Sequence, residues 1–235
     1  MDRQAFIDWV KEQRYSGKRL KEEEAAQVEL LYRSIDRFCV YLREERDIVQ
    51  IEDTILEALR AFDFNLPEND DEHLPLAFSY LGRDDLVEHI GMVSADKHFR
   101  NKTLATVFKA MDDLKEHLPS LRKAGVRMAS ELLEIGATPE GRAHLAEDTE
   151  VSPEVLLKMV QCCDLCRMTG MVGKTLSRSC AMGYDTLEKF RTTTPEQIEV
   201  DFSAYLRANG ERTNRMVSFS SFVHQAGRLE DVVVG

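Results

Sequence analysis

Residues 165–183 carry the groups of this chain that are best suited to chemistry, and the chemistry they suit is the binding of a phosphate. Their sequence is Leu-Cys-Arg-Met-Thr-Gly-Met-Val-Gly-Lys-Thr-Leu-Ser-Arg-Ser-Cys-Ala-Met-Gly. This pattern is typical of a helix-hairpin-helix, in which a glycine turn exposes backbone N–H groups before a second helix begins. Glycine allows the backbone to approach an anion or to adopt positive φ, and the helix start adds unpaired donors. The candidate nucleic-acid-binding residues are Gly170, Met171, Val172, Gly173 and Lys174 in the turn, with Arg167 and Arg178 on either side.

One position of the turn departs from the usual hairpin pattern, which is a glycine, an apolar residue and a second glycine. Val172 stands where the second glycine is expected, and the next glycine comes one residue later. A β-branched side chain resists positive φ, which weakens the case for a bound phosphate. Two hypotheses therefore stay open: the hairpin contacts a nucleic-acid backbone, or it only packs within the fold.

A diverged copy of the hairpin lies upstream. The two copies align when Gly136 is placed opposite Gly183, an offset of 47 residues. Each copy is followed by a helix start, Ser152-Pro153-Glu154 or Thr194-Pro195-Glu196, in which a hydroxyl cap precedes proline and glutamate. The alignment predicts that Gly136 and Gly183 both end a helix in the left-handed conformation.

A series of short motifs runs from about Ser120 to Leu229. It comprises residues 132–142, Leu145-Ala146, residues 152–160, Asp164-Leu165, Arg167-Met168-x-Gly170, Gly183-x-Asp185-Thr186-Leu187 and Thr194-Pro195-Glu196. Together these motifs resemble an uncharacterised prokaryotic domain family built of two degenerate helix-hairpin-helix units. The resemblance implies an all-helical fold and a binding role, and it implies no reaction.

The rest of the sequence offers no catalytic or metal-binding pattern. The six histidines are scattered, none in a spacing such as His-Glu-x-x-His, and no glycine-rich nucleotide loop follows a strand. Cys162, Cys163, Cys166 and Cys180 resemble a metal site only superficially, because adjacent cysteines on a helix point about 100° apart. We interpret them as buried thiols. The expectation is a protein that is not an enzyme and has no cofactor, no metal and no small-molecule substrate.

Charge limits the possible partners. The net charge of -11 argues against strong non-specific binding to nucleic acid, because Lys and Arg side chains supply most of the affinity of such binding. Residues 1–118 hold 17 basic and 26 acidic side chains, and residues 119–235 hold 14 and 16. The second hairpin region, residues 167–228, has a basic excess, with 9 basic and 6 acidic side chains. No apolar run approaches the roughly 20 residues that cross a bilayer, so we expect a cytoplasmic protein with no membrane contact.

Apolar residues recur at spacings of three and four along almost the whole chain, which predicts helices throughout. We expect an all-α fold, with an acidic all-helical domain over residues 1–118 and tandem helix-hairpin-helix (SAM-like) units over residues 119–235. The predicted function is non-catalytic contact with a nucleic-acid backbone, without sequence specificity, as an accessory of a larger assembly. The alternative is a protein-protein interaction adaptor whose hairpins only pack structurally.

Overall fold

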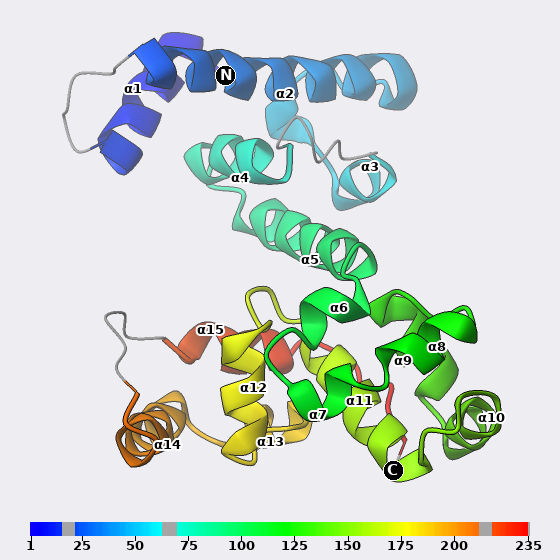
Figure 1. Cartoon of the computed structure of the whole chain (residues 1–235). Helices are drawn as coiled ribbons and strands as arrows, with labels where there is room; N and C mark the ends of the chain where they lie inside the picture. Colours follow the sequence, from blue (N-terminus) through cyan, green and yellow to red (C-terminus); the bar gives the residue numbers. More distant parts are fainter. Residues whose placement is uncertain (16–21, 63–69, 212–217, 235) are drawn as a thin grey trace. The chain divides into compact units, whose positions relative to one another are not determined.

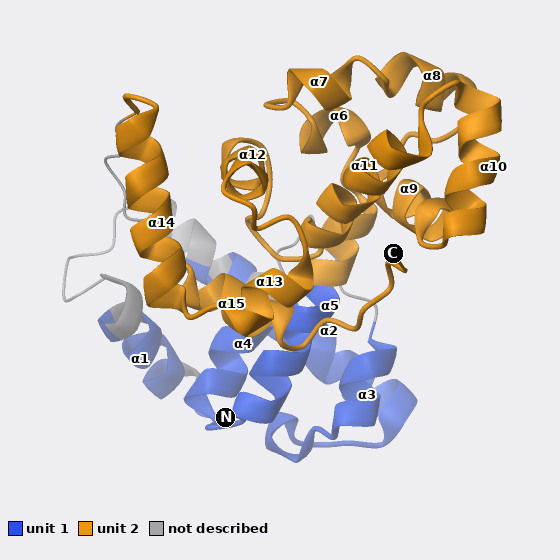
Figure 2. Cartoon of the chain, turned by 90° about the horizontal axis from the view of Figure 1, so that it is seen from below, with its two compact units in different colours: residues 1–94 blue, residues 95–235 orange. Residues whose placement is uncertain are grey.

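The structure is a computed structural model that describes residues 1–15, 22–62, 70–211 and 218–234. Within these ranges it consists of α-helices and one 3-10 helix with no β-strand, and an isolated antiparallel bridge joins Thr103 to Met128. The predicted all-α fold is therefore confirmed. The chain divides into two compact units, residues 1–94 and 95–235 (Figure 2).

The first unit is a helical bundle with an aromatic core. Its elements are α1 (Arg3–Tyr15), α2 (Glu22–Arg46), the 3-10 helix η1 (Ile51–Asp53), α3 (Leu56–Ala61), α4 (Asp70–Tyr80) and the start of α5 (Asp84–Arg100) (Figure 1). Helix α4 packs against α2 and α1. The buried Phe38 ring lies edge-on to Phe62 and Phe78, with centroids 4.9 and 5.8 Å apart. Edge-on pairs of this kind add to the free energy gained by burial.

The second unit is organised around one central helix. Its elements are α6 (Leu104–Val107), α7 (Asp112–Lys115), α8 (Leu118–Lys123), α9 (Ala129–Gly136), α10 (Pro139–Thr149), α11 (Pro153–Leu165), α12 (Lys174–Ala181), α13 (Leu187–Thr192), α14 (Pro195–Ala208) and α15 (Ser220–Ala226). Helix α11 packs against α9, α10 and α12, and α13 packs against α15 (Figure 1). The C-terminal part of α11 is buried on several faces, whereas Glu154 and Lys158 are exposed.

The division between the units lies upstream of the boundary that the sequence indicated. We expected the boundary after residue 118, whereas the compact units meet between Ser94 and Ala95, inside α5. The physical reason is that Phe99, Phe108 and their apolar neighbours are buried in the core of the second unit. Two backbone hydrogen bonds, made by the N–H groups of Leu104 and Ala129, tie residues 102–104 to residues 127–129.

The predicted helix starts are confirmed. The hydroxyl of Ser152 accepts a hydrogen bond from the N–H of Val155, and Pro153 fills the first position of α11. Thr194 does the same for the N–H of Gln197 at the start of α14. These caps fix the start of α11, which leads into the candidate turn, and the start of α14.

The two glycines of the sequence alignment have different conformations. Gly183 has a φ of +92°, as predicted, and it ends α12 in the left-handed region. For Gly136 the predicted helix end is confirmed, because α9 ends at this residue, but the predicted left-handed conformation is wrong, because its φ is not positive. A Cβ atom at Gly136 would lie only 2.4 Å from Cγ2 of Val160 on α11. Glycine is needed here for the close approach of α9 to α11.

The structural counterpart of Gly183 is Gly125, 58 residues earlier, with a φ of +90°. After each glycine the next N–H, of Val126 or Tyr184, donates to a carbonyl five residues back at 2.9 Å, which completes the same kind of helix end. A short helix follows in each case, and a Thr-Pro start then leads into α10 or α14. The second unit therefore repeats an order of local features, in a register different from the aligned one.

Candidate functional site

The candidate site is the turn between α11 and α12. Gly170 and Gly173 have φ values of +87° and +56°, so glycine is required at both positions. Val172 avoids the left-handed region, because the positive φ falls on the glycine that follows it. Met171 is fully buried, and its carbonyl accepts a hydrogen bond from the Cys166 thiol at 3.1 Å. The turn is thus anchored to the core through its apolar residue.

The start of α12 presents backbone donors that have no partner. Its N-cap residue is Gly173, which has no side chain to accept a hydrogen bond. Among the residues that the structure describes, none accepts from the N–H groups of Lys174, Thr175 or Leu176. The first N–H groups of a helix carry partial positive charge, so an anion is a favourable acceptor here.

Two lysines lie at this turn, and only one of them was predicted. Lys174 is exposed at the first position of α12. Lys109 comes from the segment after α6, and its Cε and Nζ lie 2.7 and 3.6 Å from where a Cβ of Gly173 would stand. Lys109 is itself exposed, so its aliphatic chain covers the glycine while its ammonium stays near the helix start. No local sequence signal links it to the turn, because the contact depends on the tertiary fold.

A third lysine, Lys102, contacts the backbone just before the turn. Nζ of Lys102 donates to the carbonyl of Cys166 at 2.6 Å, at the end of α11. Burial of this ammonium lowers the pKa of Lys102. The group fixes the end of α11 and is less accessible than Lys109 or Lys174.

The two arginines predicted to contact phosphate are engaged inside the fold. Arg167 pairs with Asp164 at 2.6 Å and donates to the carbonyl of Glu230 at 2.9 Å. Arg178 pairs with Glu211, and its guanidinium lies 5.9 Å from the centroid of the Phe202 ring. Their side chains are 17% and 18% exposed. Each arginine therefore stabilises the hairpin through contacts inside the fold.

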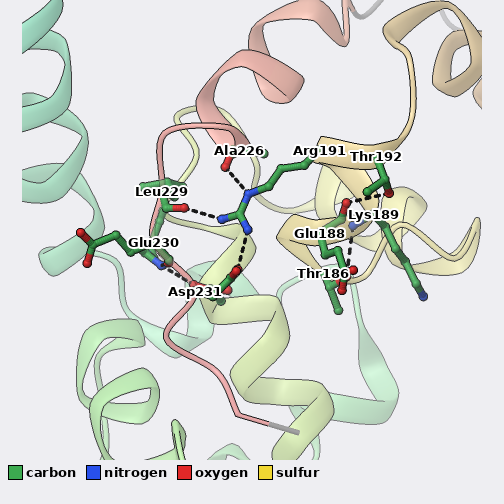
Figure 3. A network of polar contacts seen from close by, with 11 residues as sticks. Thr186, Glu188, Lys189, Arg191, Thr192, Ala226, Leu229, Glu230 and Asp231 are labelled. Atoms are coloured by element: carbon green, nitrogen blue, oxygen red, sulfur yellow. Dashed lines mark hydrogen bonds and ion pairs between the residues drawn. The ribbon is translucent and has the colours of Figure 1, made fainter.

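Further basic groups of the region are also paired internally. Arg191 donates to the carbonyls of Ala226 and Leu229 and forms an ion pair of 2.6 Å with Asp231, which holds the C-terminal segment (Figure 3). Lys189 pairs with Asp185 at 2.6 Å. Arg212 and Arg215, which contribute to the basic excess in the sequence, lie outside the described residues. Of the nine basic side chains in residues 167–228, four are therefore paired with carboxylates within the described part of the fold.

The cysteines do not form a cluster suited to a metal. All five are free, and in the described part of the chain no three His, Cys, Asp or Glu side chains are placed to hold an ion. Cys162 and Cys180 approach each other most closely, with their Sγ atoms 3.7 Å apart.

No helix among the described residues is long and apolar enough to cross a membrane.

Comparison with known proteins relates only the C-terminal half of the chain to a family. No curated protein and no solved structure matches the sequence. Residues 112–228, which run from α7 to just beyond α15, match a protein family described as Domain of unknown function (DUF4332). Through its C-terminal half, the chain belongs to this family.

Proposed function

We propose that the second unit is a non-catalytic binding module of the helix-hairpin-helix type, and that it contacts the phosphate backbone of a nucleic acid. The observation that carries the proposal is the start of α12, where three backbone N–H groups have no partner among the described residues and lie beside two exposed lysines. A phosphate oxygen fits this arrangement because it accepts several hydrogen bonds and carries the opposite charge.

The internal ion pairs change the roles within the proposed site. Lys174 and Lys109 supply the mobile charges, while Arg167 and Arg178 hold the two helices in position. The donors offered to the ligand are backbone N–H groups and lysine ammonium groups, and both kinds are suited to phosphate oxygens. Binding should therefore be independent of sequence.

The proposal also accounts for the acidic character of the chain. A net charge of -11 repels nucleic acid at a distance, so two lysines and one helix start give only weak binding by themselves. We therefore propose that the protein acts as the accessory part of a larger assembly that brings the nucleic acid close. We propose that this role is cytoplasmic, because an odd number of cysteines does not suggest the disulfide framework of a secreted protein.

Fluorescence anisotropy with labelled DNA and RNA oligonucleotides of unrelated sequence tests the proposal. We expect affinities that differ little between sequences and that fall with salt. The slope of log affinity against log salt concentration should be about -2 for two phosphate contacts. Absence of binding to any oligonucleotide at low salt would contradict the proposal. The alternative, an adaptor whose hairpins only pack, would then account better for the neutralised arginines.

A further inference from the structure

Two free thiols lie close together between the helices that flank the candidate turn. Cys162 lies near the end of α11, Cys180 lies near the end of α12, and their Sγ atoms are 3.7 Å apart. In a disulfide the two sulfur atoms are about 2.05 Å apart. Rotation of the cysteine side chains would bring these two sulfurs closer together. Cys166, just after α11, makes a different contact, because its thiol donates to the Met171 carbonyl.

The two thiols differ in access. Cys180 is partly exposed and lines a pocket of about 250 Å³, together with Asp113, Lys158 and Ser177. Cys162 is buried behind it, with 1% of its surface exposed. A small reagent that enters the pocket therefore meets Cys180 first.

The electrostatic environment favours the same order of reaction. The hydrogen bond shared with Cys162 lowers the pKa of Cys180, and the Lys158 ammonium acts in the same direction, against burial and the Asp185 carboxylate. The same hydrogen bond and burial raise the pKa of Cys162 well above its usual value. The thiolate is the nucleophilic form of cysteine, so Cys180 is the more reactive of the two.

We propose that Cys162 and Cys180 are a redox-sensitive dithiol that hydrogen peroxide converts into a disulfide between α11 and α12. The Cys180 thiolate attacks one peroxide oxygen, the O–O bond breaks, and the departing hydroxide takes a proton to form water. Cys180 is then a sulfenic acid. Cys162 loses its proton and attacks the Cys180 sulfur, so that the S–S bond forms, the S–O bond breaks and a second water leaves. Two thiols are oxidised by two electrons, and one peroxide is reduced to two waters.

The neighbouring cysteines make the proposal selective. Cys163 is fully buried, and burial raises its pKa well above the usual value. Burial raises the pKa of Cys166 to about 12. Neither is expected to react while the fold is intact. The new bond would close a loop that contains the whole Gly170–Lys174 turn, and its formation does not depend on nucleic-acid binding.

Peptide mass spectrometry of the reduced, full-length protein after hydrogen peroxide treatment tests the proposal. Free thiols are blocked with an alkylating agent. Trypsin then cuts on both sides of residues 159–167 and of residues 179–189, so that these two peptides separate unless a disulfide joins them. We expect these peptides to be joined, with the loss of two hydrogen atoms, and fragmentation to place the bond between Cys162 and Cys180. Circular dichroism before digestion confirms that the helices are intact.

Variants separate this bond from its competitors. Cys162→Ser should stop the reaction at a Cys180 sulfenic acid that a cyclic 1,3-dione traps, while Cys163→Ser is the matched control and should still form the disulfide. The proposal is overturned if Cys180 pairs with Cys163 or Cys166, or if peroxide oxidises Cys39 while Cys180 remains a free thiol. Fragmentation of the parent protein decides between these outcomes even if a variant fails to fold.

Discussion

Gly136 and Gly183 would each reject a side chain, for different physical reasons. At Gly136 the obstacle is a neighbour, because a Cβ would lie 2.4 Å from Cγ2 of Val160. At Gly183 the surroundings are open within 4 Å, and the obstacle is the backbone, whose φ of +92° disfavours any L side chain. The first constraint belongs to helix packing and the second to helix termination.

A double-mutant cycle distinguishes these two constraints. Gly136→Ala should lower the free energy of unfolding by roughly 1–3 kcal/mol through overpacking. Val160→Ala in the same chain should offset much of this loss, giving a clear coupling energy in urea unfolding. Gly183→Ala should cost roughly 1 kcal/mol through backbone strain and show no coupling to Val160→Ala. Equal coupling at both glycines would contradict the assignment.

Tyr184 should make stability depend on alkaline pH. Burial, followed by the hydrogen bond to Asp201, raises the pKa of Tyr184 to about 12, against about 10 in an unfolded chain. The folded state therefore keeps a proton that the unfolded state loses, and this contribution, complete below pH 10, disappears as pH rises toward 12. Urea unfolding should show a fall over this range, roughly 2 kcal/mol, that is absent in Tyr184→Phe. An identical fall in the variant would refute the prediction.

At the scale of elements, Arg142 connects three segments of the second unit. This residue of α10 is 4% exposed and donates to the carbonyls of Gly136 and Ala137, at 3.0 and 3.3 Å, and of Val234 at 2.8 Å. The N–H of Val234 also donates to the Ala137 carbonyl at 2.8 Å. The end of α9 and the C-terminal segment are therefore held by one guanidinium group.

Arg142→Met, which keeps an unbranched side chain but is shorter and has no donors, should leave buried carbonyls unsatisfied. We expect the free energy of unfolding to fall by roughly 3 kcal/mol in urea denaturation. Arg122→Met, at an exposed position of α8, is the matched control and should change stability by less than about 0.5 kcal/mol. Equal effects of the two substitutions would show that the Arg142 contacts are not stabilising.

Local signals could be predicted from the sequence, and long-range contacts could not. The Ser152 and Thr194 starts are encoded within a few residues, and the structure confirms both. The role of Gly136 is not local, because a glycine in the sequence does not say whether φ or a neighbour requires it. The approach of Lys109 to the turn, and the pairing of Arg178 with Glu211, likewise depend on segments that only the tertiary fold brings together.

At the scale of the whole molecule, the position of the unit boundary has a direct consequence. The core of the second unit includes Phe99, Leu104 and Phe108, which precede residue 118. A fragment of residues 95–235 should therefore unfold cooperatively in urea, with helical circular dichroism at low denaturant. A fragment of residues 119–235 lacks these side chains and should unfold at lower urea, with a broader transition. Equal stability of the two fragments would support the boundary at 118.

The central claim is that the start of α12 binds phosphate with the help of Lys109 and Lys174. The most direct test is the anisotropy titration with the double variant Lys109→Glu and Lys174→Glu, beside a control, Arg122→Glu with Lys123→Glu, that changes net charge equally on exposed side chains. We predict that the first variant loses nearly all binding at low salt while its helical circular dichroism is unchanged, and that the control retains most of its affinity. Equal binding by the first variant and the parent, or an equal loss in both variants, would contradict the account.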